Sequence, residues 1–232
     1  MGPIRRSPPF VRSTIRRLSP VSKSRMKTTP TDNLPPFATA VRARRADAQR
    51  NVERLIAAAR GAFAAHGATA PLDDIARSAG VGAGTLYRHF PTRLALVEAV
   101  YRDSVERLCA EGAHLAATES PADALVDWLR GFVIVVAEKR GLAAALNEEG
   151  QASELFAQCH AMINATGGEL LDRAKRAGAV RDDITLGDVL KMAKAFAHAA
   201  ETSPEGPALA ERLIGLSMDG LRPRASRGGA PD

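Results

Sequence analysis

Apolar residues recur every three or four positions along most of the chain, which is the spacing of helices that bury one face. The densest pattern lies between residues 71 and 90. Its first stripe has the i, i+3, i+4, i+7 spacing, at Leu72, Ile75, Ala76 and Ala79. Gly80 can then take the left-handed conformation that ends a helix, and a second short helix is predicted from about Ala83 to His89. Two short helices joined by a glycine-containing turn predict a helix-turn-helix.

The second of these helices has two unlike faces. Leu86 and Phe90 are predicted to point inward, against the rest of the motif. The outward residues are hydrogen-bond donors and cations that suit phosphates, namely Thr85, Tyr87, Arg88 and His89. Because the second helix of such a motif lies in the major groove, this face predicts DNA binding.

The same window carries a dense set of characteristic residues: Ile75-Ala76, Ala79-Gly80-Val81, Gly84-Thr85-Leu86-Tyr87, His89-Phe90 and the cation Arg93. Together they resemble the DNA-binding segment of the TetR family of bacterial one-component regulators. Many relatives carry Lys where this chain has Arg93, and either cation can hold a phosphate. Gly82 and Ala83 replace bulkier polar residues, which leaves fewer base-reading side chains at the start of the recognition helix. The resemblance covers Asp47 to about Leu221, and beyond its first 50 residues it holds only in outline.

Eight residues are predicted at the DNA interface. Phosphate contacts by Thr85 and Tyr87 would fix the register of the protein on the duplex. Cations before the motif would reach phosphates or a narrow minor groove, although a solvated charge run is the alternative for each. The full set is Arg45, Arg50, Ala83, Thr85, Tyr87, Arg88, His89 and Arg93.

Further helices are predicted on both sides of the motif. A first long helix, with Asp47 as its N-cap, has an apolar stripe that ends at Phe63 and braces the motif. Thr92 is predicted to cap a long helix that runs towards His114. Ser120-Pro121 is a good start for another helix.

The segment Phe132–Val136 is apolar on every side. It could form a strand, but no second strand-like run exists to pair with it, so a helix buried all round is predicted. Residues 141–150 are expected to form a linker or a small helix. The helix over residues 152–175 is expected to be kinked or broken at Gly167-Gly168.

The fold class predicted is therefore all-α, with about nine helices. Residues 1–40 are expected to be a disordered basic arm, and residues 41–92 the helix-turn-helix domain. Residues 93–221 are expected to form a helical ligand-binding and dimerisation domain, and residues 222–232 a disordered tail. The resemblance implies dimerisation through the last two helices, at about residues 185–221, the first of them capped by Thr185.

The net charge of +6 is unevenly distributed. Residues 1–46 hold eleven Lys or Arg and one acid, a net charge of +10, so the remaining residues carry −4. A basic arm before a DNA-binding domain suggests phosphate contact. A start at Met26 and an organellar transit peptide are the other interpretations, and no secretory apolar segment occurs.

The resemblance also implies a small-molecule pocket within the C-terminal helices. A mostly apolar pocket with one or two polar anchors suits the composition. Plain core packing is the competing interpretation for each candidate, because helical bundles need apolar stripes anyway. The candidates are His114, Trp128, Phe132, Phe156, Cys159, His160 and Met162.

Other chemistry finds little support in the sequence. None of the common nucleophile, zinc or nucleotide-binding motifs occurs, and Cys159 and His160 diverge by about 100° on a helix. The five histidines lack metal-ligand spacing. We therefore predict no catalytic residue, no metal and no cofactor, and the two distant cysteines indicate a reducing compartment.

The function predicted is a ligand-responsive transcription regulator, a repressor that binds a palindromic operator as a homodimer in the bacterial cytoplasm. An architectural DNA-binding protein without a ligand is the alternative, which a steep salt dependence with weak sequence preference would favour. An enzyme on a helical scaffold is disfavoured by the missing motifs, and no membrane association is predicted.

Overall fold

The computed structural model describes residues 36–142 and 152–223, and these residues form an all-α fold. Within them lie eight α-helices and one short 3₁₀ turn, close to the expected nine. A linker or small helix was predicted at residues 141–150, of which residues 143–150 lie outside the described residues. Residues 1–35 of the predicted arm and residues 224–232 of the predicted tail lie outside them as well. The elements are α2 (Pro36–His66), η1 (Gly67–Thr69), α3 (Leu72–Ser78), α4 (Ala83–His89), α5 (Arg93–Thr118), α6 (Pro121–Gly141), α8 (Ala152–Arg176), α9 (Leu186–Thr202) and α10 (Pro207–Leu221).

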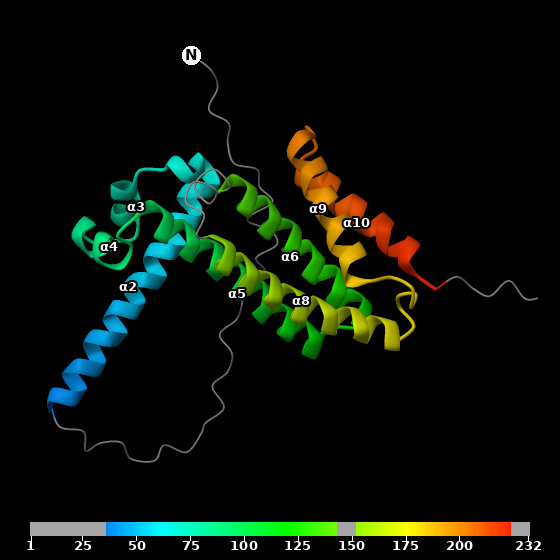
Figure 1. The fold of residues 1–232 in the computed structure, drawn as a ribbon, viewed down its shortest axis with the longest axis horizontal. Helices are drawn as coiled ribbons and strands as arrows, with labels where there is room; N and C mark the ends of the chain where they lie inside the picture. Colours follow the sequence, from blue (N-terminus) through cyan, green and yellow to red (C-terminus); the bar gives the residue numbers. More distant parts are fainter. Residues whose placement is uncertain (1–35, 143–151, 224–232) are drawn as a thin grey trace, which may run out of the picture.

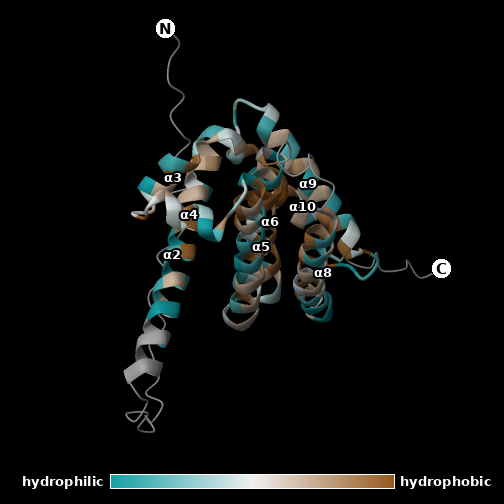
Figure 2. Cartoon of the chain, turned by 60° about the vertical axis from the view of Figure 1, so that its left-hand side comes forward, coloured by the Kyte–Doolittle hydropathy of each residue, from teal (hydrophilic) through white to brown (hydrophobic). Residues whose placement is uncertain are grey.

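The described residues divide into a small head, formed by α2, η1, α3 and α4, and a longer helical bundle, formed by α5, α6, α8, α9 and α10. Figure 1 shows α3 and α4 beside the C-terminal half of α2, while α5, α6 and α8 run together away from them and α9 and α10 cover the far side. Helices α5 and α8 run in the same direction, since Tyr101 lies against Phe156 and Gly112 against Thr166. Figure 2 shows the hydrophobic residues gathered between α5 and α6.

Side-chain caps begin the helices where the sequence predicted them. The Thr92 hydroxyl accepts a hydrogen bond from the Ala95 N–H, and the Ser120 hydroxyl accepts one from the Asp123 N–H. Thr185 and Asp188 form a reciprocal capping box at the start of α9. Each cap satisfies N–H groups that have no partner within the helix.

The first helix begins much earlier than predicted, at Pro36 instead of after Asp47. Asp47 forms an ion pair with Arg50 and does not cap the helix. The segment from residue 36 to residue 46 is rich in Ala and Arg, which are strong helix formers. Its basic composition obscured this propensity, so the last five residues of the expected disordered arm are helical.

Two expectations within the bundle were wrong, the break in α8 and the complete burial of α6. Helix α8 continues through Gly167-Gly168 as a single helix, which excludes a break there. Helix α6 is not buried all round, because Ile134 is 40 % exposed, although Phe132, Val133 and Val135 are buried. A small residue is needed at Gly167 for packing: a Cβ there would lie 2.5 Å from Cη2 of Trp128.

Candidate nucleic-acid interface

The helix-turn-helix is held together by the predicted apolar residues. Gly80 has φ of +66°, a conformation that L side chains rarely adopt, and it turns the chain between α3 and α4. Leu86 and Phe90 are 1 % and 7 % exposed, and they pack into the core with Ile75 of α3 and Leu55 of α2. Packing against α2 and α3 therefore buries one side of α4 and fixes its orientation.

The opposite side of α4 faces outward. Tyr87 is 47 % exposed, although it is one of the largest side chains in the chain, and Ala83 and Arg88 are exposed as well. Thr85 and His89 are partly buried. An aromatic side chain that is exposed among hydrogen-bond donors is better placed for contact with a partner than for packing in the core. The structure thus brings five of the eight predicted DNA-contact residues together on one short helix.

Arg93 has a structural role that the sequence did not reveal. Its Nη1 donates hydrogen bonds to the carbonyl oxygens of Ala68 and Ala70, at 2.7 and 2.6 Å. These carbonyls belong to the connection between α2 and α3, so the guanidinium ties the start of α5 to the rear of the motif. The predicted phosphate contact of Arg93 would have to come from its other N–H groups.

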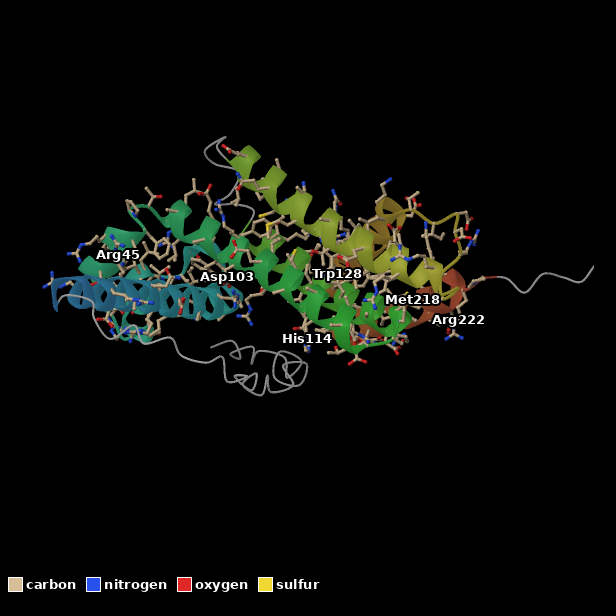
Figure 3. The ribbon with its side chains drawn as sticks, turned by 90° about the horizontal axis from the view of Figure 1, so that it is seen from below. Arg45, Asp103, His114, Trp128, Met218 and Arg222 are labelled. Carbon is tan, nitrogen blue, oxygen red and sulfur yellow. The ribbon has the colours of Figure 1, made fainter. Side chains whose placement is uncertain are left out.

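The cations of α2 extend the exposed surface away from α4. Arg42, Arg44 and Arg45 are exposed near the beginning of the helix. Figure 3 shows Arg45 on the part of α2 that projects beyond the bundle. Arg50 is 62 % exposed and is paired with Asp47.

Arg54 was missed by sequence reasoning. It is exposed on α2, it donates a hydrogen bond to the side-chain oxygen of Asn51, and its Nη1 would lie 3.7 Å from a Cβ placed on Gly80. The Arg54 side chain therefore reaches the turn between α3 and α4. Only its position directly before Leu55, in the stripe that packs on the motif, could have indicated this.

An ion pair joins the head to the bundle. Arg60 of α2 pairs with Asp103 of α5, and their side chains are only 21 % and 34 % exposed. Burial lowers the pKa of Arg60, as does the charge of Arg107, whereas the charge of Glu138 on α6 opposes this shift. Figure 3 shows Asp103 between the helices of the head and the bundle. Arg60 therefore lies at the junction of α2, α5 and α6.

The residues predicted for a ligand pocket are scattered through the bundle. His114 and His160 are exposed, Phe156 and Met162 are half-buried, and the others are buried. Trp128 is fully buried in the core, stacked on Phe132 with ring centroids 5.8 Å apart. Its Nε1 is buried and has no hydrogen-bond partner among the described residues, an arrangement that usually needs an explanation.

In the part of the chain that the structure describes, no group of three or more His, Cys, Asp or Glu could hold a metal ion. No helix in residues 36–142 and 152–223 is long and apolar enough to cross a membrane.

Comparison with known proteins agrees with this geometry. The family model described as bacterial regulatory proteins of the tetR family matches residues 55–100, and that described as the C-terminal domain of SbtR-like transcriptional regulators matches residues 120–223. No curated protein matches the chain.

Two solved structures are similar over nearly their whole length. A TetR transcriptional regulator of Streptomyces coelicolor is 40 % identical, with a TM-score of 0.68, and the match covers 75 % of this chain and 99 % of that one. A TetR transcription regulatory protein of Mycobacterium vanbaalenii is 41 % identical, with a TM-score of 0.63 and coverage of 77 % and 99 %. The exposed recognition helix, the matched domains and these relatives together show that the chain belongs to the TetR family of DNA-binding transcriptional regulators.

Proposed function

We propose that the protein is a homodimeric repressor that binds a palindromic operator and is released by a small molecule bound in residues 93–221. The observation that carries this proposal is the outward face of α4, where Tyr87 stands 47 % exposed on a helix whose other face is buried. In a two-fold dimer, two such helices would enter successive major grooves, and the dimer would set the spacing of the half-sites. Such a protein acts where the bacterial chromosome lies, in the cytoplasm.

Exposed apolar residues support dimerisation through α9 and α10. Leu216 of α10 is 63 % exposed, the most exposed large apolar side chain among the described residues. Its neighbours Gly215 and Gly220 have open space where a Cβ would be. A second copy of the same face could approach closely there and cover Leu216.

The effector is proposed to bind within the bundle, which holds the seven pocket candidates. The unpartnered Nε1 of Trp128 supports a polar contact there. No ligand needs to reach α4 itself, because a shift of α5 or α6 would act on α2 through the Arg60–Asp103 pair. Coupling of this kind requires that the effector bind one arrangement of the helices more tightly than the other.

The test is DNase footprinting on DNA immediately upstream of the protein's own gene, at two salt concentrations. We expect a protected palindrome for the wild-type protein and its loss in Tyr87→Ala. Tyr87→Phe is the matched variant: it keeps the ring and removes the hydroxyl, so partial binding would separate the packing contact from the hydrogen bond. Light scattering of Leu216→Glu should show a monomer if α10 forms the interface.

Three results would contradict the proposal. Uniform, salt-sensitive coating of any DNA would indicate an architectural protein with weak sequence preference. Protection that survives Tyr87→Ala would remove α4 from the interface. A dimer that persists in Leu216→Glu would place dimerisation on another face.

A further inference from the structure

The C-terminal end of α6 carries a lysine in an unusual setting. Nζ of Lys139 lies 3.9 Å from the ring centroid of Phe156 and 5.7 Å from that of Tyr101. The two rings meet edge to face, with centroids 5.6 Å apart. An aromatic floor built from α5 and α8 therefore holds the ammonium group of α6 in place by cation–π attraction.

Two further basic groups approach from neighbouring helices. His160 follows Phe156 by one turn of α8, and Lys194 comes from α9. Burial lowers the pKa of His160, and the charges of Lys139 and Lys194 lower it further. Burial and the charge of Lys194 likewise lower the pKa of Lys139. Basic groups from three helices thus lie within electrostatic range of one another.

Among the residues that the structure describes, these three groups lack an acidic partner of the kind that Arg140 has. Arg140, the residue after Lys139, forms a hydrogen-bonded ion pair with Glu201 of α9 at 2.7 Å. Within residues 36–142 and 152–223, no ion pair to Asp or Glu is found for Lys139, His160 or Lys194. No ion pair within the described residues therefore offsets the mutual repulsion of the cluster, and a bound anion would reduce it.

We propose that Lys139, His160 and Lys194 bind the anionic group of an organic effector, a carboxylate or sulfonate whose apolar body packs beside Phe156. Phe156 is only half-buried and so offers apolar surface next to the cations. A charged group at one end and a flat apolar wall at the other would select an amphiphilic anion over a neutral molecule or a small inorganic ion. This inference rests on the proposed ligand-responsive function and names the chemical class of the ligand.

The position of the cluster also suits control of DNA binding. Glu138, adjacent to Lys139 on α6, lies within electrostatic range of Arg60 on α2. One turn of α6 therefore faces the cationic cluster on one side and the head on the other. An anion that draws Lys139 towards Lys194 would change the position of Glu138 relative to the Arg60–Asp103 pair.

The experiment is isothermal titration calorimetry of the full-length protein with 2-naphthoate, its neutral counterpart 2-naphthalenemethanol, and inorganic phosphate. We expect naphthoate to bind, and the alcohol and phosphate to bind at least tenfold more weakly. Lys139→Met, which keeps the aliphatic length, should weaken naphthoate binding about tenfold, and Lys194→Met several-fold. Lys139→Arg should restore most of the affinity. Lys191→Met removes another exposed lysine of α9 and should change nothing.

Several outcomes would overturn the inference. These are equal affinity for acid and alcohol, equal affinity in all four variants, or no naphthoate binding. Thermal unfolding of each variant shows whether it is folded, and footprinting of the same samples separates the two proposals. Operator protection without Lys139-dependent naphthoate binding would refute the anion site alone. Lys139-dependent binding without any operator would keep the site and refute the regulator.

Discussion

Glycines occur for different reasons in the head and in the bundle. Gly80 in the head has φ of +66°, and a Cβ there would make only an ordinary van der Waals contact, 3.7 Å from Nη1 of Arg54, so it is the backbone conformation that requires glycine. Gly112 and Gly167 in the bundle lie within regular helices, and contact requires them: a Cβ on either would lie within 3 Å of the Trp128 ring. The glycine of the head is thus required by local backbone conformation, whereas the glycines of the bundle are required by the side chain packed against them.

The sharpest test of this difference is Gly167→Ala. The new Cβ would lie 2.5 Å from Cη2 of a fully buried tryptophan, and overpacking of this kind lowers the free energy of unfolding by up to about 3 kcal/mol. Urea unfolding measures the effect. Gly168→Ala is the control, since nothing lies within 4 Å of its Cβ, and better helix propensity should stabilise it by up to about 1 kcal/mol. Equal effects of the two substitutions would show that the close approach of Trp128 is unimportant.

In the head, the next largest effect is expected from Arg93→Met. The substitution removes two charge-assisted hydrogen bonds to the carbonyls of Ala68 and Ala70, and we expect a loss of about 2 kcal/mol in the free energy of unfolding. Arg88→Met, at an exposed position on α4, should leave stability unchanged and weaken DNA binding. A stable Arg93→Met protein that binds DNA poorly would assign Arg93 to the phosphate contact instead.

Gly80→Ala tests the backbone requirement directly. An L residue in the left-handed conformation is destabilised by about 1–2 kcal/mol, so the free energy of unfolding should fall by that amount. Gly84→Ala, within α4 and with nothing near its Cβ, should be neutral or slightly stabilising. Thermal unfolding of both variants compares them, and a stability loss in Gly84→Ala alone would contradict the assignment.

The smallest effect concerns pH and the capping box of α9. The hydrogen bonds from the side chain and backbone of Thr185 lower the pKa of Asp188 from its ordinary value of about 3.8. The cap therefore stabilises the fold above pH 4 and loses this contribution as the pH falls through the lowered pKa. The melting temperature of Asp188→Ala should lie below that of the wild type at pH 6, and the difference should shrink below pH 4. A difference that is constant with pH would exclude the carboxylate as its source.

The features of the DNA interface that the sequence predicted correctly depend on residues that are close together in the chain. The bounds of α4 were predicted as Ala83 to His89 and are confirmed, and Gly80, Leu86 and Phe90 have the predicted conformation and burial. The roles of Arg54 and Arg93 could not be predicted, because each depends on a group that is distant in sequence. Arg93 contacts carbonyls 23 and 25 residues earlier in the chain.

The bundle was predicted less well for the same reason. Periodicity indicated its helices, but it suggested a break at Gly167 because a glycine pair is normally a weak point within a helix. Tertiary contact reverses that inference, since the tryptophan ring occupies the space that a side chain would need. Likewise, Phe132–Val136 is uniformly apolar, yet which of its residues stays exposed depends on the helices packed around it.

The sequence by itself determined the helical class, the caps at Thr92, Ser120 and Thr185, and the recognition helix with its two faces, because these depend on hydrogen bonds and side-chain spacing within a few residues. Only the tertiary structure decided that Arg93 ties the motif together and that Arg60 joins the head to the bundle. It also decided that Lys139 of α6, His160 of α8 and Lys194 of α9 come within electrostatic range of one another. Such groups meet only when separate helices pack, and their energies depend on burial and on charges that the order of residues does not reveal.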